Sequence, residues 1–438
     1  MEVFLIIAVL LLIILLIIGV PAVFAFLAAT IFLVMTLDYD PSFLLPYGYS
    51  QLSSTVLLAI PLFIIAGKLM EYGGIGNVII GWAEILVGKI KGGLGIVTIF
   101  ACAIFGSISG SAMAALSTIG SIMFKKLDAK GYPRGYAAAL VSNASILGLL
   151  IPPSGIMILY AWLSNQSVLA SFLSTIVPGL ILITLLSIIN ILYMRKRELR
   201  PEQEFETDLN RSLKYRAKKF GIKTFVSIPG LVMPVLVLGG IYSGIMTTTE
   251  AAAVAAFYAI PVGFWVYKGL KLKDFKTIFI NAATTTGIIM VMVFAIMILS
   301  RIYVMENIPN LITEALFSIT ENTFFLIIML NIFMIIIGML MDDVSGVLLT
   351  TPILLPIITN LGVDPIHFAA ILAVNLGMGN ITPPTAPLLY FGGQLAKAPI
   401  NEMIKPTLII ILFAWLPTLL VVTYIPEVAL FLPNLLLK

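Results

Sequence analysis

Ala138–Ser154 reads AALVSNASILGLLIPPS, and Ala369–Thr385 reads AAILAVNLGMGNITPPT. Aligned without a gap, the two stretches share both alanines, a glycine and a proline pair, and a hydroxyl residue follows each pair. Two consecutive prolines interrupt a regular helix, because each lacks a backbone donor and clashes with the preceding turn. Within a membrane, the freed backbone groups are tolerated only where they line a cavity or face protein. The repeated break therefore predicts a transport site between two internal repeats.

The composition places both stretches in a membrane protein. The chain has 438 residues, of which 60% are hydrophobic and 11% are charged, and its mean hydropathy is +1.12. Apolar runs long enough to span a bilayer recur from end to end, which predicts an all-α polytopic membrane protein. Cys102 and His367 are each the only residue of their type, which excludes internal disulfides and the usual zinc or Ser/His/Asp chemistry.

Basic residues predict which connections face the cytoplasm. Segment 195–224 carries ten basic and five acidic residues, so we expect a cytoplasmic linker there. Lys91 and Lys125 also favour the cytoplasm, although mostly apolar residues separate them. The stretch between them is therefore predicted to be a re-entrant hairpin that turns at Gly106–Ser111.

The second half of the sequence predicts a matching hairpin that turns at Asp342–Gly346 and enters from the opposite side. We therefore expect two inverted-topology repeats, each with three helices, an interfacial arm helix, a re-entrant hairpin and a Pro-Pro-broken helix, and periplasmic termini. In the first repeat, 1–194, the expected parts are scaffold helices within 1–70, an arm at 75–90, a hairpin at 92–124, a broken helix at 134–165 and a helix at 168–194. In the second repeat, 225–438, they are scaffold helices within 225–300, an arm at 308–319, a hairpin at 323–361, a broken helix at 366–397 and a helix at 404–424.

The first candidate cation site combines a serine-rich turn with the first break. Hydroxyl and carbonyl oxygens without fixed charge suit a monovalent cation such as Na⁺ that must be released again. The alternative is that these small residues only permit close helix packing. The candidate ligands are Ser107, Ser109, Gly110, Ser111, Asn143, Pro152 and Ser154.

The second candidate cation site contains carboxylates, which are costly inside a membrane and usually functional there. The alternative is that the turn reaches water, where aspartates are ordinary. Its candidate ligands are Asp342, Asp343, Ser345, Asn375, Thr382 and Thr385. Sodium is the only metal that we expect, and the sequence predicts no cofactor.

Four residues are candidates for contact with an anionic substrate: Ser109, Ser154, Thr385 and Arg301. Arg301 follows an apolar run and could hold a carboxylate, but such an arginine more often extends to the membrane surface. The sequence has no phosphate-binding loop of the Gly-x4-Gly-Lys-Ser/Thr type, so we expect an ion gradient to drive transport.

Several ordered motifs together resemble one family across essentially the whole chain: the large membrane subunit of TRAP (tripartite ATP-independent periplasmic) transporters. They are GSISGSA at 106–112, Gly131-Tyr132, LIPPS at 150–154, GMLMD at 338–342, TTPILLP at 350–356 and TPPT at 382–385. The resemblance implies a bacterial inner-membrane permease that imports an organic acid, such as a C4-dicarboxylate, sialic acid or keto acid, together with Na⁺. It also implies an elevator mechanism and two partners: a small four-helix membrane subunit, expected as a separate polypeptide, and a periplasmic substrate-binding protein.

Other classes of protein fit the sequence less well. A stand-alone Na⁺- or H⁺-coupled carboxylate carrier on a related inverted-repeat fold is the main alternative. A membrane enzyme is disfavoured, because Asp342 and Asp343 are adjacent and point differently, and one histidine offers too little acid–base chemistry. A channel is disfavoured by the paired broken helices, and nothing indicates binding to nucleic acid.

Overall fold

The structure, a computed structural model, describes residues 2–87, 90–195, 197 and 213–437. Within these ranges all regular secondary structure is helical, which confirms the all-α prediction. In the described part, eight helices are long and apolar enough to cross a membrane. A ninth span is formed if Arg134–Leu150 and Gly155–Ser164, which meet at a bend of 43°, are counted together. The chain is therefore a multi-pass membrane protein.

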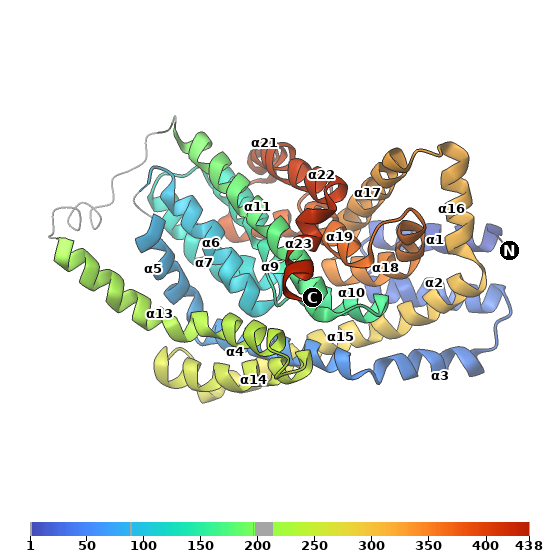
Figure 1. Cartoon of the computed structure of the whole chain (residues 1–438), viewed down its shortest axis with the longest axis horizontal. Coiled ribbons are helices and arrows are strands. Elements are labelled where there is room, and N and C mark those ends of the chain that lie inside the picture. Colours follow the sequence, from blue (N-terminus) through green and yellow to red (C-terminus); the bar gives the residue numbers. More distant parts are fainter. Residues whose placement is uncertain (1, 88–89, 196, 198–212, 438) are drawn as a thin grey trace.

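The first half begins with a helical hairpin and continues through two shorter helices to an arm, a hairpin and a broken helix (Figure 1). Its helices are α1 (Glu2–Ile17), α2 (Ala22–Thr36), α3 (Pro41–Leu52), η1 (Thr55–Leu58), α4 (Ala59–Tyr72), α5 (Ile75–Val87), α6 (Gly93–Ser109), α7 (Ala112–Ala129), α8 (Arg134–Ser145), α9 (Leu147–Leu150), α10 (Gly155–Ser164) and α11 (Val168–Arg195).

Helix α3 departs from the expected three helices before the arm. Asp40 caps it by accepting a hydrogen bond from the Ser42 amide at 2.8 Å, and Pro41 occupies its first turn, a favourable position for proline. Gly48 lets the helix approach α15, since a β-carbon there would lie 2.9 Å from Phe294 and Ile298. The polar composition of 41–52 resembles that of a loop, which is why the sequence did not predict this helix.

The second half repeats the order of arm, hairpin and broken helix. Its helices are α13 (Leu213–Tyr242), α14 (Thr248–Pro261), the π-helical turn η2 (Val262–Val266), α15 (Leu272–Met305), α16 (Ile308–Ile319), α17 (Thr323–Leu340), α18 (Asp343–Asn360), α19 (Pro365–Gly379), α20 (Pro387–Ala396), α21 (Ile400–Ile410), the π-helical turn η3 (Ile411–Trp415), α22 (Leu416–Tyr424) and α23 (Pro426–Leu436).

The second half differs from the prediction at the start of one helix and by one additional helix. Helix α13 begins at Leu213, within the expected linker 195–224, because the Lys- and Arg-rich sequence at 213–224 favours a helix. Residues 196 and 198–212 of that linker lie outside the described ranges, as do residues 88–89 at the end of the first arm. A further helix, α23, follows α22 because Pro426 starts a new turn after Ile425, whose φ of −121° and ψ of 87° are not helical.

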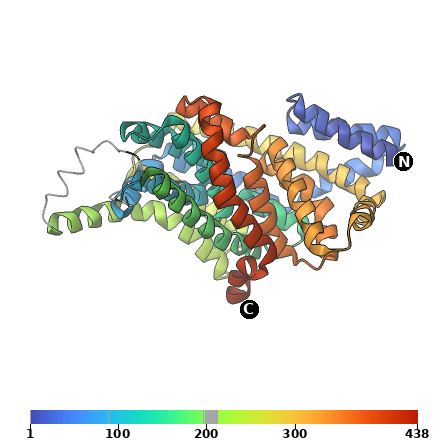
Figure 2. The same ribbon diagram turned by 90° about the horizontal axis from the view of Figure 1, so that it is seen from above.

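The helices segregate into two groups. Helices α3, α4, α14 and α15 lie together along the lower edge of the molecule in Figure 1, and α4 packs against both α14 and α15. The two hairpins and the two broken helices lie above them, and nearly every residue of α8 and α19 is buried. The arms α5 and α16 lie at opposite ends of the molecule, whereas the stretch α21–α22 crosses its middle (Figures 1 and 2).

The two halves interlock through their broken helices. Helix α10, the second part of the first broken helix, packs against α18 of the second hairpin. Reciprocally, α20, the second part of the other broken helix, packs against α7 and α8. The two broken helices also meet directly, since a β-carbon on Gly377 would lie 2.7 Å from the Ile146 side chain. The core of the protein is therefore shared between the halves.

Candidate functional site

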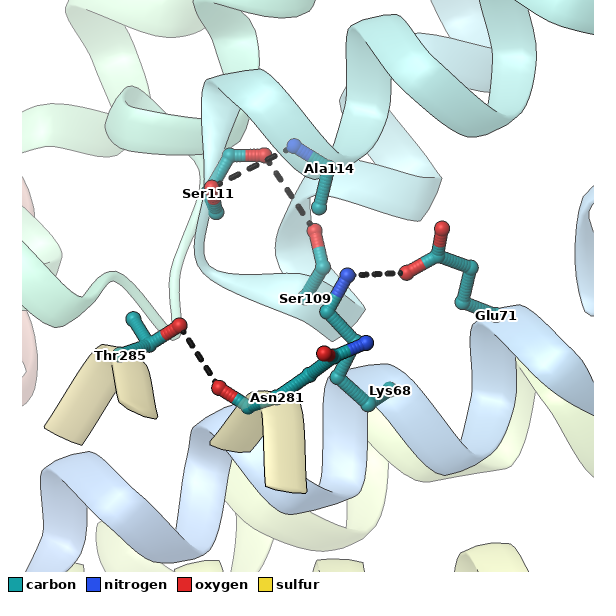
Figure 3. Close-up of polar contacts among 7 residues, drawn as sticks. All are labelled: Lys68, Glu71, Ser109, Ser111, Ala114, Asn281 and Thr285. Carbon is teal, nitrogen blue, oxygen red and sulfur yellow. Dashed lines mark hydrogen bonds and ion pairs between the residues drawn. The ribbon is translucent and has the colours of Figure 1, made fainter. Parts of the chain in front are cut away.

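The tip of the first hairpin is a tight turn between α6 and α7. Gly110 adopts the left-handed conformation with φ of +63°, which glycine accommodates without strain. The Ser109 hydroxyl donates to the Ser111 carbonyl at 3.4 Å, and the Ser111 hydroxyl accepts from the Ala114 amide at 3.4 Å (Figure 3). The second bond caps α7. The serine spacing therefore builds an oxygen-rich turn, as the sequence predicted.

This turn lies against the first proline break. A β-carbon on Gly110 would lie 3.3 Å from both the Pro153 carbonyl oxygen and the Gly155 nitrogen. One helical turn earlier, α6 crosses α9 with the two backbones in contact, since a β-carbon on Gly106 would lie 2.2 Å from the Gly148 Cα. The structure thus brings together the turn and the break that the sequence placed in one site.

Ser154 is the serine of this cluster whose hydroxyl lacks a hydrogen-bond partner among the described residues. Its side chain is buried. It follows the cis Pro152–Pro153 bond and occupies the N-cap of α10 without capping it through its side chain. A buried hydroxyl without a partner costs about 1–3 kcal/mol, so a ligand at this position would relieve that cost. The Ser107 hydroxyl, by contrast, donates to the carbonyl of Ile104 at 2.7 Å within its own helix.

Asn143 connects the first broken helix to the C-terminal region. Its side-chain amide donates to the Ala139 carbonyl at 2.7 Å, and its oxygen accepts from the Trp415 indole at 2.9 Å. Both the asparagine and the tryptophan are fully buried. The sequence identified Asn143 as a candidate ligand but did not predict its partner, which lies in the π-helical turn η3.

The second hairpin turn carries the carboxylates. Asp342 accepts a hydrogen bond from the Ser345 hydroxyl, and Asp343 accepts one from the Asn380 side-chain amide. Asp342 is exposed and Asp343 half-buried, whereas Ser345 and Asn380 are buried. Ser345 also lies 3.1 Å from the sulfur of Met292 on α15. Asn380 was not among the predicted ligands, although an asparagine three residues before the second proline pair can be recognised from the sequence.

The second break repeats the glycine contact of the first. A β-carbon on Gly338 of α17 would lie 2.9 Å from the Leu376 carbonyl oxygen, and one on Gly379 would lie 2.6 Å from the Gly338 Cα. Gly379 aligns with Gly148 in the repeated stretches, and a cis Pro383–Pro384 bond follows, as in the first break. Each hairpin therefore crosses its broken helix at a glycine pair, just before the prolines.

The other predicted ligands of the second site lie in different surroundings. The Asn375 amide donates to Asn331 at 2.8 Å, and Asn331 in turn donates to Thr423 at 3.2 Å, which links α17, α19 and α22. The Asn375 side-chain oxygen is buried and has no partner among the described residues. The Thr382 hydroxyl donates to the carbonyl four residues before it at 2.6 Å, and Thr385 is exposed.

Helix α4 lies against the first hairpin turn. A β-carbon on Gly67 would lie 3.0 Å from the Ser109 Cα. The next residue, Lys68, forms a 2.8 Å ion pair with Glu71, and the side chains are 29% and 19% exposed. Figure 3 shows this pair and Asn281 of α15 close to the turn. This pair was not among the predicted site residues, although a lysine and a glutamate three residues apart in an apolar helix can be recognised from the sequence.

Arg301 lies in the last turns of α15, and its guanidinium carbon is 5.5 Å from the centroid of the Tyr47 ring on α3. The structure therefore pairs this arginine with an aromatic ring of α3.

Comparison with known proteins identifies the family. Residues 9–428 match the family described as "Tripartite ATP-independent periplasmic transporter, DctM component". The chain is 35% identical to the C4-dicarboxylate TRAP transporter large permease protein DctM of Pseudomonas aeruginosa, covering 86% of each protein. It is 31% identical to the sialic acid TRAP transporter large permease protein SiaM of Vibrio cholerae, covering 96% of each.

A longer relative and a solved structure complete the comparison. The chain is 34% identical to the isethionate TRAP transporter permease protein DctMQ of Oleidesulfovibrio alaskensis, covering 95% of this chain but only 64% of that protein. The crystal structure of the Alcanivorax borkumensis YdaH transporter matches the fold with a TM-score of 0.58 at 13% identity, covering 86% of this chain and 85% of that chain. The match over residues 9–428 and the likeness to the large permease proteins of Pseudomonas aeruginosa and Vibrio cholerae show that the chain belongs to the DctM component family of tripartite ATP-independent periplasmic transporters and is a transporter permease, not an enzyme.

Proposed function

We propose that this large permease subunit imports an organic acid anion together with Na⁺. The observation that carries the proposal is the pairing, in each half, of an oxygen-rich hairpin turn with a Pro-Pro break. Broken helices of this kind supply free carbonyls for a cation and free amides for an anion near the middle of a membrane. Relatives named for C4-dicarboxylate, sialic acid and isethionate suggest the class of cargo: a small organic acid that carries at least one negative charge.

The two turns supply different ligands for the cation. In the first, the hydroxyl of Ser154 and the oxygens of Ser109 and Ser111 carry no net charge. In the second, Asp342 and Asp343 supply carboxylates. Hard cations such as Na⁺ favour both kinds of oxygen, and the carboxylates add Coulombic attraction. We therefore expect the second site to bind Na⁺ more tightly than the first.

The mechanism that we propose is an elevator movement of the hairpins and broken helices against a scaffold of α1–α4 and α13–α15. Two contacts lie at the interface between these groups: Gly67 with Ser109, and Met292 with Ser345. Both join a scaffold helix to a hairpin turn. Sliding of the hairpins would break both contacts and carry the bound cation and anion with the turns.

The family further supports two partners and a location. By its description the family is one component of a tripartite transporter, so we propose a small membrane subunit and a periplasmic substrate-binding protein as partners. The location would be the bacterial inner membrane, with the termini in the periplasm and the linker 195–224 in the cytoplasm. The substrate-binding protein would then determine which organic acid is delivered.

Reconstitution tests the proposal. Proteoliposomes containing this chain and the small membrane subunit are supplied with an inward Na⁺ gradient, the binding protein and labelled C4-dicarboxylate, sialic acid or isethionate. We expect uptake of one acid that requires both the gradient and the binding protein. Uptake without a Na⁺ gradient would refute symport with Na⁺, and uptake without the binding protein would favour the stand-alone carrier.

A further inference from the structure

A cavity of about 450 Å³ lies where the start of α8, the end of α11 and the start of α21 meet. It is separate from both hairpin turns, and the proposed transport function does not use it. Two cationic side chains, Arg197 and Lys405, line it together with the rings of Tyr136 and Tyr193. One acidic residue, Glu402, also belongs to its lining.

Aromatic rings hold Arg197 in place. Its guanidinium carbon lies 4.9 Å from the centroid of the Tyr193 ring, and Nη2 donates to the Tyr193 hydroxyl at 3.2 Å. Tyr193 stacks on Tyr136 with the centroids 3.8 Å apart and the planes within 3°, and the Tyr136 hydroxyl donates to Asn190 at 3.3 Å. The remaining guanidinium donors have no hydrogen-bond partner among the described residues. A guanidinium positioned in this way suits the planar, two-point recognition of phosphate.

The surrounding backbone strengthens the attraction for an anion. Helices α8 and α21 begin after Pro133 and Pro399, and neither proline provides a side-chain cap. The first amides of α8 therefore add partial positive charge at the end of the cavity, whereas Glu402 in the first turn of α21 offsets the charge of that helix end. Tight packing keeps these helix ends together, since a β-carbon on Gly135 would lie 2.5 Å from Glu402.

The position of the cavity indicates the source of the anion. Helix α11 is one of the candidate membrane spans, and Arg197 lies just beyond its last residue, Arg195. The end of a span is at the level of lipid headgroups, where tyrosine rings and basic side chains are favoured. Pro406 and Ile409 add apolar lining that suits the upper part of an acyl chain. We propose that this cavity binds the phosphate of an anionic membrane lipid, held by Arg197 and Lys405.

The test measures lipid binding to the purified full-length chain in detergent. The melting temperature is followed while dioleoyl phosphatidylglycerol, dioleoyl phosphatidylcholine or inorganic phosphate is added. We expect phosphatidylglycerol to raise the melting temperature and phosphatidylcholine to do so much less. The double variant R197Q/K405Q should need about tenfold more phosphatidylglycerol for the same effect, as expected for the loss of two partly screened charge contacts.

A matched control distinguishes lipid binding in the cavity from a general effect of positive charge on the protein. The double variant K273Q/K276Q removes the same two charges from exposed positions at the start of α15 and should respond to phosphatidylglycerol like the original protein. Glu402→Gln should strengthen the response, because it removes the acid from the lining, and it keeps the test informative if R197Q/K405Q does not fold. Three results would each overturn the proposal: equal effects of the two lipids, equal losses in both double variants, or stabilisation by inorganic phosphate alone.

Discussion

Replacing Gly106 with alanine tests whether the close contact between Gly106 and Gly148 is needed for the packing of the first hairpin against its broken helix. The added methyl carbon would lie 2.2 Å from the Cα and 2.7 Å from the nitrogen of Gly148. Carbon atoms in favourable contact are about 3.5–4.0 Å apart, so the two backbones would have to separate by roughly 1.3–1.8 Å. No side chain can rotate away to relieve this clash, because both partners are glycines.

The expected loss of stability follows from this clash. Overpacking of a core costs about 1–3 kcal/mol, and contact between two backbones favours the upper end of that range. Alanine is favoured over glycine within a helix by roughly 0.5–1 kcal/mol, which offsets part of the cost. We therefore expect Gly106→Ala to lower the free energy of unfolding by about 2 kcal/mol.

Thermal unfolding of the purified protein measures this effect. A loss of this size should lower the melting temperature by a few degrees, and Gly379→Ala, with its 2.6 Å clash against Gly338, should behave alike. The matched control is Gly155→Ala in the same break, where the added carbon would lie 3.8 Å from the Gly110 carbonyl oxygen, an ordinary contact distance. Equal melting temperatures of Gly106→Ala and Gly155→Ala would show that the contact between Gly106 and Gly148 tolerates a methyl group, which would refute the expected clash.

Three further predictions concern the two turns and the scaffold beside them. Asp342→Ala should abolish Na⁺-dependent uptake in proteoliposomes while the protein keeps its elution volume in size-exclusion chromatography; unchanged Na⁺ dependence would remove Asp342 from the site. Ser154→Ala should raise the free energy of unfolding by about 1 kcal/mol, since it removes a buried hydroxyl without a partner, yet weaken the apparent affinity for Na⁺ in uptake assays. A fall in both stability and affinity would mean that the hydroxyl has a structural role instead. For Lys68 and Glu71, a double-mutant cycle of Lys68→Gln and Glu71→Gln should give a coupling free energy of up to about 1 kcal/mol in thermal unfolding; no coupling would show that the ion pair does not stabilise the fold.

An amphipathic helix was predictable from the sequence, whereas a more polar helix of the same length was not. The arm at 308–319 matches α16 in both boundaries, because its apolar residues recur at helical spacing on one face. Helix α3 escaped prediction because its Pro, Tyr, Ser and Gly residues have low helix propensity, and contact with α15 stabilises it instead. Packing between distant segments decided its structure, and such packing is not encoded in a local pattern.

In the candidate site, too, local features were predictable and contacts between distant segments were not. The turn residues were predictable because serines and aspartates stand out in apolar sequence. Their partners were harder to find: Asn380 pairs with Asp343 across 37 positions, and Trp415 pairs with Asn143 across 272. Spacing along the chain gives no information about such pairs. Asn143 therefore looked like a free ligand, although the fold already uses its side chain.

The packing of each broken helix against the other half of the chain has a consequence for biogenesis. Helix α10 packs against α18, and α20 packs against α7 and α8. During synthesis, α10 emerges long before α18, the helix that will cover it. The interval between the synthesis of α7 and α8 and that of α20 is longer still. The first half therefore enters the bilayer with its packing surfaces still open, and lipid or an insertion chaperone must shield them. Final assembly can occur only after nearly the whole chain has been translated, so premature termination anywhere before α20 should yield a product that quality-control proteases degrade.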